Sequence, residues 1–533
     1  MELGAAAYLL TAMGFGAASK MPLHAAVERG SKAERLERTA RCLEQGVDVG
    51  TRTPRHGYTA LHFAAAAEDG EAVEAAIQLL IQKGAKVDAK SDTGGTPLHS
   101  AAHHGRPGAV AAAVRTLVAA GADVNIREQR GSTPLHDAVT NENPTAASAA
   151  VAALLEAGAD VRARNADGDE PLHVAVRCGK PAGVTAITQQ LLAAGADVHS
   201  KGEGGGTPLH CAALNKDPAA ASAAIQQLHA AGADLAAADG QRRTPLHCAA
   251  RFGAAATVAL LIRRLQAAAG VEESGHSGMP LPHATTHSSA GSDAVDGRDA
   301  QGSTPLHHAT MHKSAAAVAA IIQQLAAAGA DLNAKDQYGC TPLHRAAQGS
   351  SADTVATVVA ALLRTGADKG CRGPLGATPL HCAAAHPNAA GSVAAIQLLL
   401  AAGADPNSRD DQGCTSLHWA AANVDSEAAA AAVAALAAAG ADVHAADCSG
   451  RQPLHVVACA QYQFPIMCPP NCFYEDLAAA ARALIAAGAD PCAHDAAGRT
   501  PLQLVQQRAD AAAHRELAQL LAAPEDDLLL AYA

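Results

Sequence analysis

A four-residue motif recurs along this 533-residue chain at a nearly constant interval, and this regularity restricts its possible folds more than any other feature. Thr-Pro-Leu-His stands unchanged at residues 96–99, 133–136, 207–210, 244–247, 304–307, 341–344 and 378–381. Variants of the motif occupy 21–24, 59–62, 170–173, 415–418, 452–455 and 500–503, which makes thirteen copies, numbered repeats 1 to 13. Consecutive motif histidines are mostly 37 residues apart, and Gly-Ala-Asp usually follows 22 residues after each. Such a period predicts a linear array of similar units.

Each part of the repeat has a local structural reason. Threonine is a favoured N-cap, and proline fits the first turn of a helix, where its missing N–H costs nothing. The glycine of Gly-Ala-Asp suits the left-handed end of a second helix. Asp336 to Gly339 is typical of the segment before the motif, and Asp-x-x-Gly favours a tight hairpin. We therefore expect two helices and a hairpin turn in each unit.

These two motifs resemble the ankyrin repeat, whose unit is about 33 residues with a T-P-L-H-x-A signature. The resemblance covers roughly residues 20–523. It implies an all-α fold, a helical solenoid with short β-hairpin turns, in which the motif histidines tie their own turn to the neighbouring backbone. It also implies that binding takes place on the hairpin tips and first helices, which line a concave groove.

The 37-residue period exceeds this family's usual repeat by about four residues, or one helical turn. The extra residues lie between His and Gly, in the second helix. In repeat 9 the apolar residues of this segment recur with helical spacing at Val355, Val358, Val359, Leu362 and Leu363. The sequence therefore predicts second helices of about fourteen residues.

Three regions and two insertions follow from the period. Residues 1–19 are interpreted as an N-terminal extension or capping helix, residues 20–523 as the repeat array, and residues 524–533 as an acidic C-terminal tail. An insertion at about 271–293 is rich in Ser, Gly, His and Pro, and we expect a mobile loop there. A second, at 461–473, gathers aromatic residues in and beside it: Tyr462, Phe464, Phe473 and Tyr474. Two interpretations of these aromatics stay open, an exposed contact site and a seal on the end of the core.

Charge and cysteine content narrow the function classes. The chain has 39 Lys and Arg against 51 Asp and Glu, a formal charge of −12, and no basic run, so nucleic acid is not an expected partner. No apolar run is long enough to span a membrane. Several of the thirteen cysteines recur at equivalent repeat positions, which is typical of small buried fillers and not of a disulfide framework. We expect a monomer in the reducing cytoplasm, with the nucleus as the alternative.

Catalytic chemistry has no evident residues. The motif histidines already have a structural role, and the acidic residues stand singly at turns, so no acid–base pair is expected. The spacing of His276, His283 and His287 matches no zinc template, and the Cys468 and Cys472 pair lacks a matching second pair. We therefore expect no catalytic residue, no metal site and no cofactor.

The sequence instead favours a protein-interaction scaffold that binds an extended partner in the groove. A structural or cytoskeletal spacer and a substrate adaptor for a modifying enzyme remain the alternatives. Binding residues are expected where side chains vary while the template holds. Besides the four aromatics of the second insertion, the candidates are Arg130, Arg177, Arg251, Phe252, Met311, His312, Gln337, Tyr338, Arg345 and Trp419. The members in repeats 7 to 9 form the preferred region.

Overall fold

The computed structural model describes residues 22–28, 32–67, 70–274, 295–349, 351–423, 425–459, 478–507 and 515–522. These residues form α-helices and two short 3-10 turns, with no β-strand among them. The chain divides into two compact units, one up to Ala249 and one from Ala250 onward. The all-α solenoid expected from the sequence is thus confirmed.

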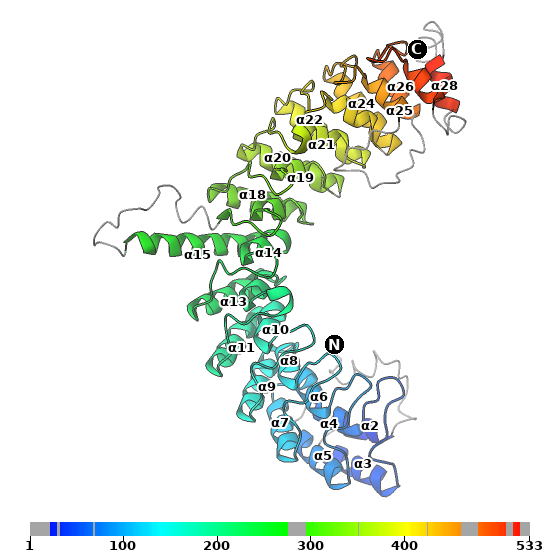
Figure 1. Ribbon diagram of the computed structural model, residues 1–533. Coiled ribbons are helices and arrows are strands. Elements are labelled where there is room, and N and C mark those ends of the chain that lie inside the picture. The colour runs from blue at the N-terminus through cyan, green and yellow to red at the C-terminus, as the bar shows by residue number, and fades with distance from the viewer. Residues whose placement is uncertain are drawn as a thin grey trace. The chain divides into compact units, whose positions relative to one another are not determined.

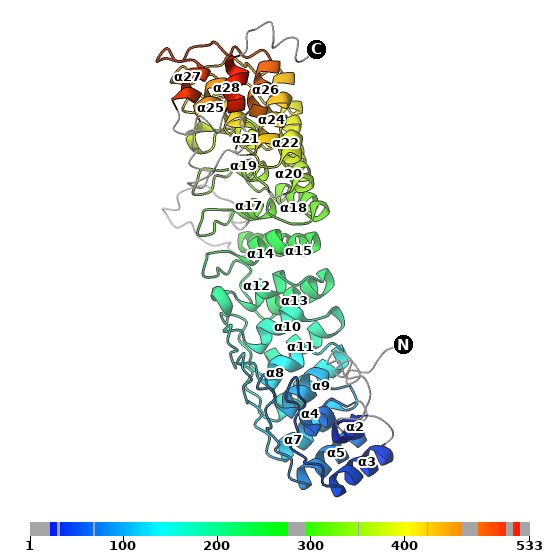
Figure 2. The same cartoon turned by 90° about the vertical axis from the view of Figure 1, so that its right-hand side faces the viewer.

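Each repeat supplies a short first helix and a longer second helix. The first helices are α2 (Pro22–Glu28), α4 (Ala60–Ala65), α6 (Pro97–His104), α8 (Pro134–Val139), α10 (Pro171–Cys178), α12 (Pro208–Ala213), α14 (Pro245–Phe252), α17 (Pro305–Ala309), α19 (Pro342–Ala346), α21 (Pro379–Ala384), α23 (Ser416–Ala421), α25 (Pro453–Cys459) and α27 (Pro501–Gln506). The second helices are α3 (Lys32–Glu44), α5 (Gly70–Gln82), α7 (Val110–Ala119), α9 (Pro144–Glu156), α11 (Pro181–Ala193), α13 (Pro218–Ala230), α15 (Ala255–Ser274), α18 (Ala315–Ala327), α20 (Ala352–Thr365), α22 (Ala389–Ala401), α24 (Ser426–Ala438), α26 (Ala478–Ala486) and α28 (Arg515–Ala522). In the second unit, the colour gradient of Figure 1 follows the repeats in chain order, and Figure 2 shows α17, α19 and α21 in one column beside α18, α20 and α22.

In most repeats the motif threonine and histidine start the first helix together. In repeat 9, Thr341 is the N-cap of α19, and its amide N–H donates to His344 Nδ1 at 3.3 Å. Histidine therefore takes the place of the glutamate of a capping box, while the proline occupies the first turn. Leu343 points into the stack and is 1% exposed. The local start signals predicted from the sequence are those that the helix uses.

The second nitrogen of the same ring joins neighbouring repeats. His344 Nε2 lies 3.0 Å from the carbonyl oxygen of Ala377, and His307 Nε2 lies 3.0 Å from that of Cys340, in each case 33 residues further on. Because Nδ1 accepts the threonine N–H, Nε2 carries the proton and the ring is neutral. Burial lowers the pKa of His344 to about 4, which favours this neutral form. The structural role expected of the motif histidine is thus present.

Most second helices bury one face and are followed within two residues by a left-handed glycine. Most have 13 residues, and α20 has 14. The buried face of α18 consists of Val318, Ile321, Ile322 and Leu325. Helix α20 ends at Gly366 with a φ of 102°, a left-handed conformation that other residues adopt at a cost.

The hairpin turns organise around a buried aspartate. In repeat 9, Asp336 Oδ1 accepts the backbone N–H groups of Tyr338 and Cys340, both at 2.9 Å. Adjacent hairpins are linked by a backbone bond between their tips, such as Gln337 N–H to the Gln301 carbonyl at 2.8 Å. The turns are therefore ordered by side-chain and inter-repeat bonds and do not extend into strands in the described residues.

One boundary differs from the expectation. We expected a loop from residue 271, but α15 continues to Ser274 and has 20 residues. The sequence of the helix end, Ala-Ala-Ala-Gly-Val-Glu-Glu, contains strong helix formers on both sides of Gly270, and a single glycine does not stop it. The rest of that insertion, the N-terminal region 1–19, the second insertion 461–473 and the tail 524–533 lie outside the described residues.

Candidate functional site

Large apolar side chains are exposed in only one part of the described structure. They are Phe252, Met311, Tyr338 and Leu375, with 54%, 57%, 58% and 37% of their surface accessible. These residues belong to repeats 7, 8 and the hairpins that precede repeats 9 and 10, and all lie on hairpins or at the ends of first helices. Exposed apolar groups that gather on one face are typical of an interaction surface.

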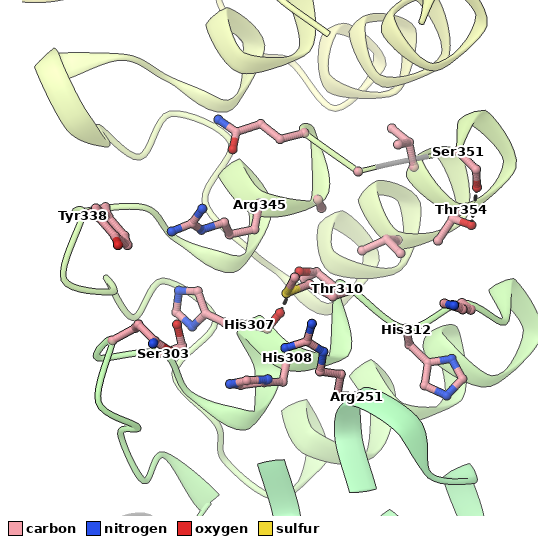
Figure 3. Close-up of a pocket in the computed structure, with 18 residues that line it drawn as sticks. Arg251, Ser303, His307, His308, Thr310, His312, Tyr338, Arg345, Ser351 and Thr354 are labelled. Carbon is pink, nitrogen blue, oxygen red and sulfur yellow. Dashed lines mark hydrogen bonds between the residues drawn. The ribbon is translucent and has the colours of Figure 1, made fainter. Parts of the chain in front are cut away.

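A pocket of about 640 Å³ is lined by residues of repeats 7, 8 and 9. Its walls come from the hairpin and first helix of repeats 8 and 9, from Arg251 at the end of α14, and from the start of α20. Figure 3 shows Tyr338 and Arg345 at one end, Ser351 and Thr354 at the other, and Arg251 with His308 along the lower wall. A volume of this size is typical of sites that hold a ligand or a bulky side-chain group.

Arg345 is held at the edge of this pocket by a buried carboxylate. Its Nε and Nη2 atoms lie 2.9 and 2.5 Å from Asp336 Oδ2, and its guanidinium carbon lies 5.3 Å from the centre of the Tyr338 ring. Burial lowers the pKa of Arg345, but the hydrogen bonds that Arg345 donates to Asp336 outweigh it and hold the pKa above its usual value. The arginine therefore stays charged and fixed in position beside an exposed aromatic ring.

The same hairpin aspartate finds a different partner in other repeats. His308 Nε2 lies 2.8 Å from Asp299 Oδ2, and in repeat 11 the Trp419 indole N–H donates to Asp410 Oδ2 at 2.9 Å. Burial raises the pKa of Asp299, but bonds from His308 and nearby backbone N–H groups outweigh it and lower the pKa overall. Histidine, arginine and tryptophan thus satisfy one buried carboxylate position in three repeats.

The prediction that Trp419 binds a partner is therefore wrong. Only 1% of its surface is exposed, and its one polar atom is bonded to Asp410. The sequence showed that tryptophan departs from the template directly after the motif histidine. It did not show that this position faces the preceding hairpin, where a large ring is buried between repeats.

The prediction that His312 binds a partner is wrong for a related reason. It is 8% exposed, its Nε2 lies 3.0 Å from the Gly253 carbonyl, and its Nδ1 accepts the Ser314 N–H at 3.0 Å. Nε2 thus joins repeat 8 to repeat 7, and Nδ1 is used within repeat 8. This leaves the ring no free polar group for a partner.

His312 belongs to a second set of inter-repeat contacts that the sequence analysis missed, here named the clamp residues. Each stands five positions after its motif histidine, bonds to a carbonyl of the preceding repeat and accepts the N–H two residues ahead. The set is Asn141, Asn215, His312, His386 and Asn423. The signal was present as an Asn or His that recurs at one offset.

The remaining predicted residues are placed as follows. Gln337 is exposed at the hairpin tip next to Tyr338, and Phe252 stacks with Arg251, whose guanidinium carbon lies 5.0 Å from the ring centre. Arg177 is paired with Asp169 at 2.7 Å, and Arg130 is exposed on its hairpin. These last two belong to repeats 5 and 4 and do not line the pocket. Tyr462, Phe464, Phe473 and Tyr474 lie outside the described residues.

Two other kinds of site were sought in the described part of the chain. No group of three or more His, Cys, Asp or Glu side chains there is arranged to hold a metal ion. No helix among the same residues has the length and apolar character to cross a membrane. No disulfide bond joins the cysteines of these residues, and burial raises the pKa of the Cys382 thiol to about 12, so this thiol stays protonated at neutral pH.

The architecture defines a helical repeat protein whose units bury one another. A family model described as ankyrin repeats (3 copies) matches residues 23–112, 108–189, 181–272, 284–360, 355–447 and 388–468. The chain belongs to the ankyrin repeat family, whose members generally mediate protein–protein interactions and are typically not catalytic. A comparison with curated proteins gave no match.

Proposed function

We propose that this protein is a non-catalytic interaction scaffold that binds an extended protein partner along its hairpins and first helices, with the main contact in repeats 7 to 9. The observation that carries the proposal is the position of Phe252, Met311 and Tyr338. These side chains are more than half exposed, and among the described residues the other exposed large apolar side chain is Leu375, at 37%.

The composition of this surface also supports contact with a protein. Arg251, Tyr338 and Arg345 are of the residue types enriched at binding hot spots, and Met311 offers a flexible apolar side chain. Arg251 lies against Phe252, and Arg345 lies against Tyr338, so both cations are presented beside an aromatic ring. We include Arg130 and Arg177 of the first unit and Gln337 of the second as further contacts on hairpins and first helices, in the reducing cytoplasm.

The test is crosslinking mass spectrometry on the full chain in native extract. A discrete partner should crosslink through Lys313, which is exposed next to Met311, and the crosslink should be lost in a Met311→Ser, Tyr338→Ser double variant. The matched control replaces two exposed arginines of the second helices, Arg263 and Arg364, with serine, and should leave the crosslink in place. Recovery of the chain only in an insoluble assembly would favour the spacer function instead.

A further inference from the structure

The pocket lies at a boundary, between repeats 8 and 9, where the clamp residue is missing. His312 and His386 fill this position in repeats 8 and 10, and each ring bonds to the preceding repeat. Repeat 9 has Gly349 at the same offset, so no side chain extends toward repeat 8. A Cβ atom at Gly349 would lie 2.8 Å from Val355 Cγ2, so a larger residue here would require Val355 or the backbone to shift.

The pocket is positive although the chain is acidic. Arg251, Lys313 and Arg345 line it, and no Asp or Glu does. The two nearby carboxylates, Asp299 and Asp336, are buried behind the wall and bonded to His308 and Arg345. Asp353 lies at the start of α20 and is exposed, but it is not part of the lining. Arg251 and Lys313 therefore leave a net positive charge on a chain whose formal charge is −12.

The pocket wall is also apolar. Val355 and Val358 of α20 and Met311 after α17 contribute to it, and Tyr338 stands at its hairpin end. An occupant that only carried negative charge would leave these groups in contact with water. An occupant with a large apolar side chain would cover them, at a gain that grows with the area buried.

We propose that this pocket docks an acidic peptide segment that carries a large aliphatic or aromatic side chain. The apolar side chain enters between repeats 8 and 9, over Val355 and Met311, and the carboxylates lie toward Arg251 and Lys313. This inference rests on the proposed scaffold function and specifies the chemistry of the partner at its main contact. The repulsion between the acidic chain and an acidic partner limits binding to this positive site, which makes the location selective.

The experiment measures fluorescence anisotropy with three labelled pools of ten-residue synthetic peptides and the purified full chain. The first pool combines Asp and Glu with Leu and Phe, the second replaces Leu and Phe with Ser, and the third replaces Asp and Glu with Lys. Only the first pool should bind with a micromolar dissociation constant. Its affinity should fall about tenfold in an Arg251→Glu, Lys313→Glu variant, because each reversed charge faces the peptide.

Matched variants separate this result from a loss of folding. Reversal of Arg263 and Arg364 changes the total charge equally on the second helices and should leave binding unchanged. A Met311→Ser, Tyr338→Ser variant should lose the preference for the first pool over the second. Equal binding of the basic pool, or displacement of the peptide by oligothymidine of equal charge, would overturn the proposal.

The failure of this proposal can be told apart from the failure of the scaffold. If the charge-reversed variant retains its crosslinked partner in native extract, the chain is still a scaffold and the assigned pocket is wrong. If no pool binds and sedimentation shows that the pocket variants abolish self-association, the occupant is a second copy of this chain. Absence of any partner or self-association would reject both proposals.

Discussion

At the scale of single residues, the motif histidine does three tasks that no other residue type does equally well. In repeat 9, His344 Nδ1 accepts the Thr341 N–H and also forms a hydrogen bond with the Thr341 hydroxyl. Its Nε2 bonds to the Ala377 carbonyl of the next repeat. In repeat 13 the position is Gln503, whose Oε1 accepts the Thr500 N–H at 3.0 Å. Glutamine thus retains the capping bond, and it provides a natural control for the ring's contribution.

A His344→Gln variant should be less stable than the wild type at pH 7, and this difference in stability should close and then reverse by pH 5. The lost bond to Ala377 costs about 1 kcal/mol at neutral pH. Burial lowers the pKa of His344 to about 4, so between its ordinary value of 6.5 and about 4 the unfolded chain binds more protons than the folded one. Lower pH therefore destabilises the wild type through this residue, by about 2 kcal/mol at pH 5, and glutamine escapes this loss.

The measurement is the urea midpoint by far-UV circular dichroism at pH 7 and pH 5. A His199→Gln variant serves as the control, since His199 is exposed at the surface, and its midpoint should follow the wild type at both values. A difference between wild type and His344→Gln that stays constant with pH would show that the buried ring is not the source of the acid sensitivity.

At the scale of elements, the clamp residues join first helices in pairs. Gly105, Gly179, Gly253 and Gly349 provide carbonyls to a clamp residue in the next repeat. From repeat 3 to repeat 10, glycine-bearing and clamp-bearing repeats alternate. In this part of the chain the clamp bonds therefore fall within pairs of repeats, and the pocket beside Gly349 lies between two of these pairs.

An Asn215→Ala variant should destabilise the contact between α10 and α12. It removes the bonds to the Val176 and Gly179 carbonyls at 2.9 and 3.0 Å and the bond from the Asp217 N–H at 2.9 Å, and leaves buried groups unpaired at a cost of about 1–3 kcal/mol. Hydrogen exchange of the amides in both helices should accelerate accordingly. Cys178→Ala changes the same offset in the neighbouring repeat, where the side chain is exposed, and should have little effect. Equal effects of the two variants would mean that the clamp contributes nothing.

Among the second helices, α24 should be less protected than α20. The buried face of α24 has three alanines with Val433 and Leu436, whereas that of α20 has three valines with Ala361 and Leu362. Two valines fewer correspond to about 3 kcal/mol less apolar burial. Native-state hydrogen exchange, corrected for intrinsic rates, should show faster local opening in α24. Protection in α24 equal to that in α20 would show that alanine packing compensates fully.

The helices could be predicted from the sequence because local residues mark where they start or end. Thr341 and Pro342 start α19, Gly366 ends α20, and the 37-residue period fixes their order. The exposed binding residues could not be predicted in the same way, because a residue that varies between repeats can face either the solvent or the neighbouring repeat. His312 and Trp419 vary and are buried, whereas Met311 and Tyr338 vary and are exposed. Only the packing of adjacent repeats separates the two groups.

At the scale of the whole molecule, the longest-range polar contacts of the motif histidines reach only the next repeat. The bonds of His136, His307 and His344 all span 33 residues. Stability in such an array is a sum of nearest-neighbour terms, so distant repeats need not unfold together. The single tryptophan, Trp419, is buried in repeat 11 and reports on its own surroundings, while circular dichroism reports on every helix.

We therefore expect Trp419 fluorescence and circular dichroism to give different urea midpoints. Two matched variants should shift these two midpoints differently. Leu172→Ala in repeat 5 removes a fully buried side chain, which costs about 2–5 kcal/mol, and should shift the circular dichroism curve in urea but not Trp419 fluorescence. Leu380→Ala in repeat 10 removes an equally buried leucine in the repeat that contacts Trp419, and should shift both curves. If Leu172→Ala moved the fluorescence midpoint as much as Leu380→Ala, the 533 residues would unfold as one cooperative body, and the passive linear surface on which the binding proposal depends would be excluded.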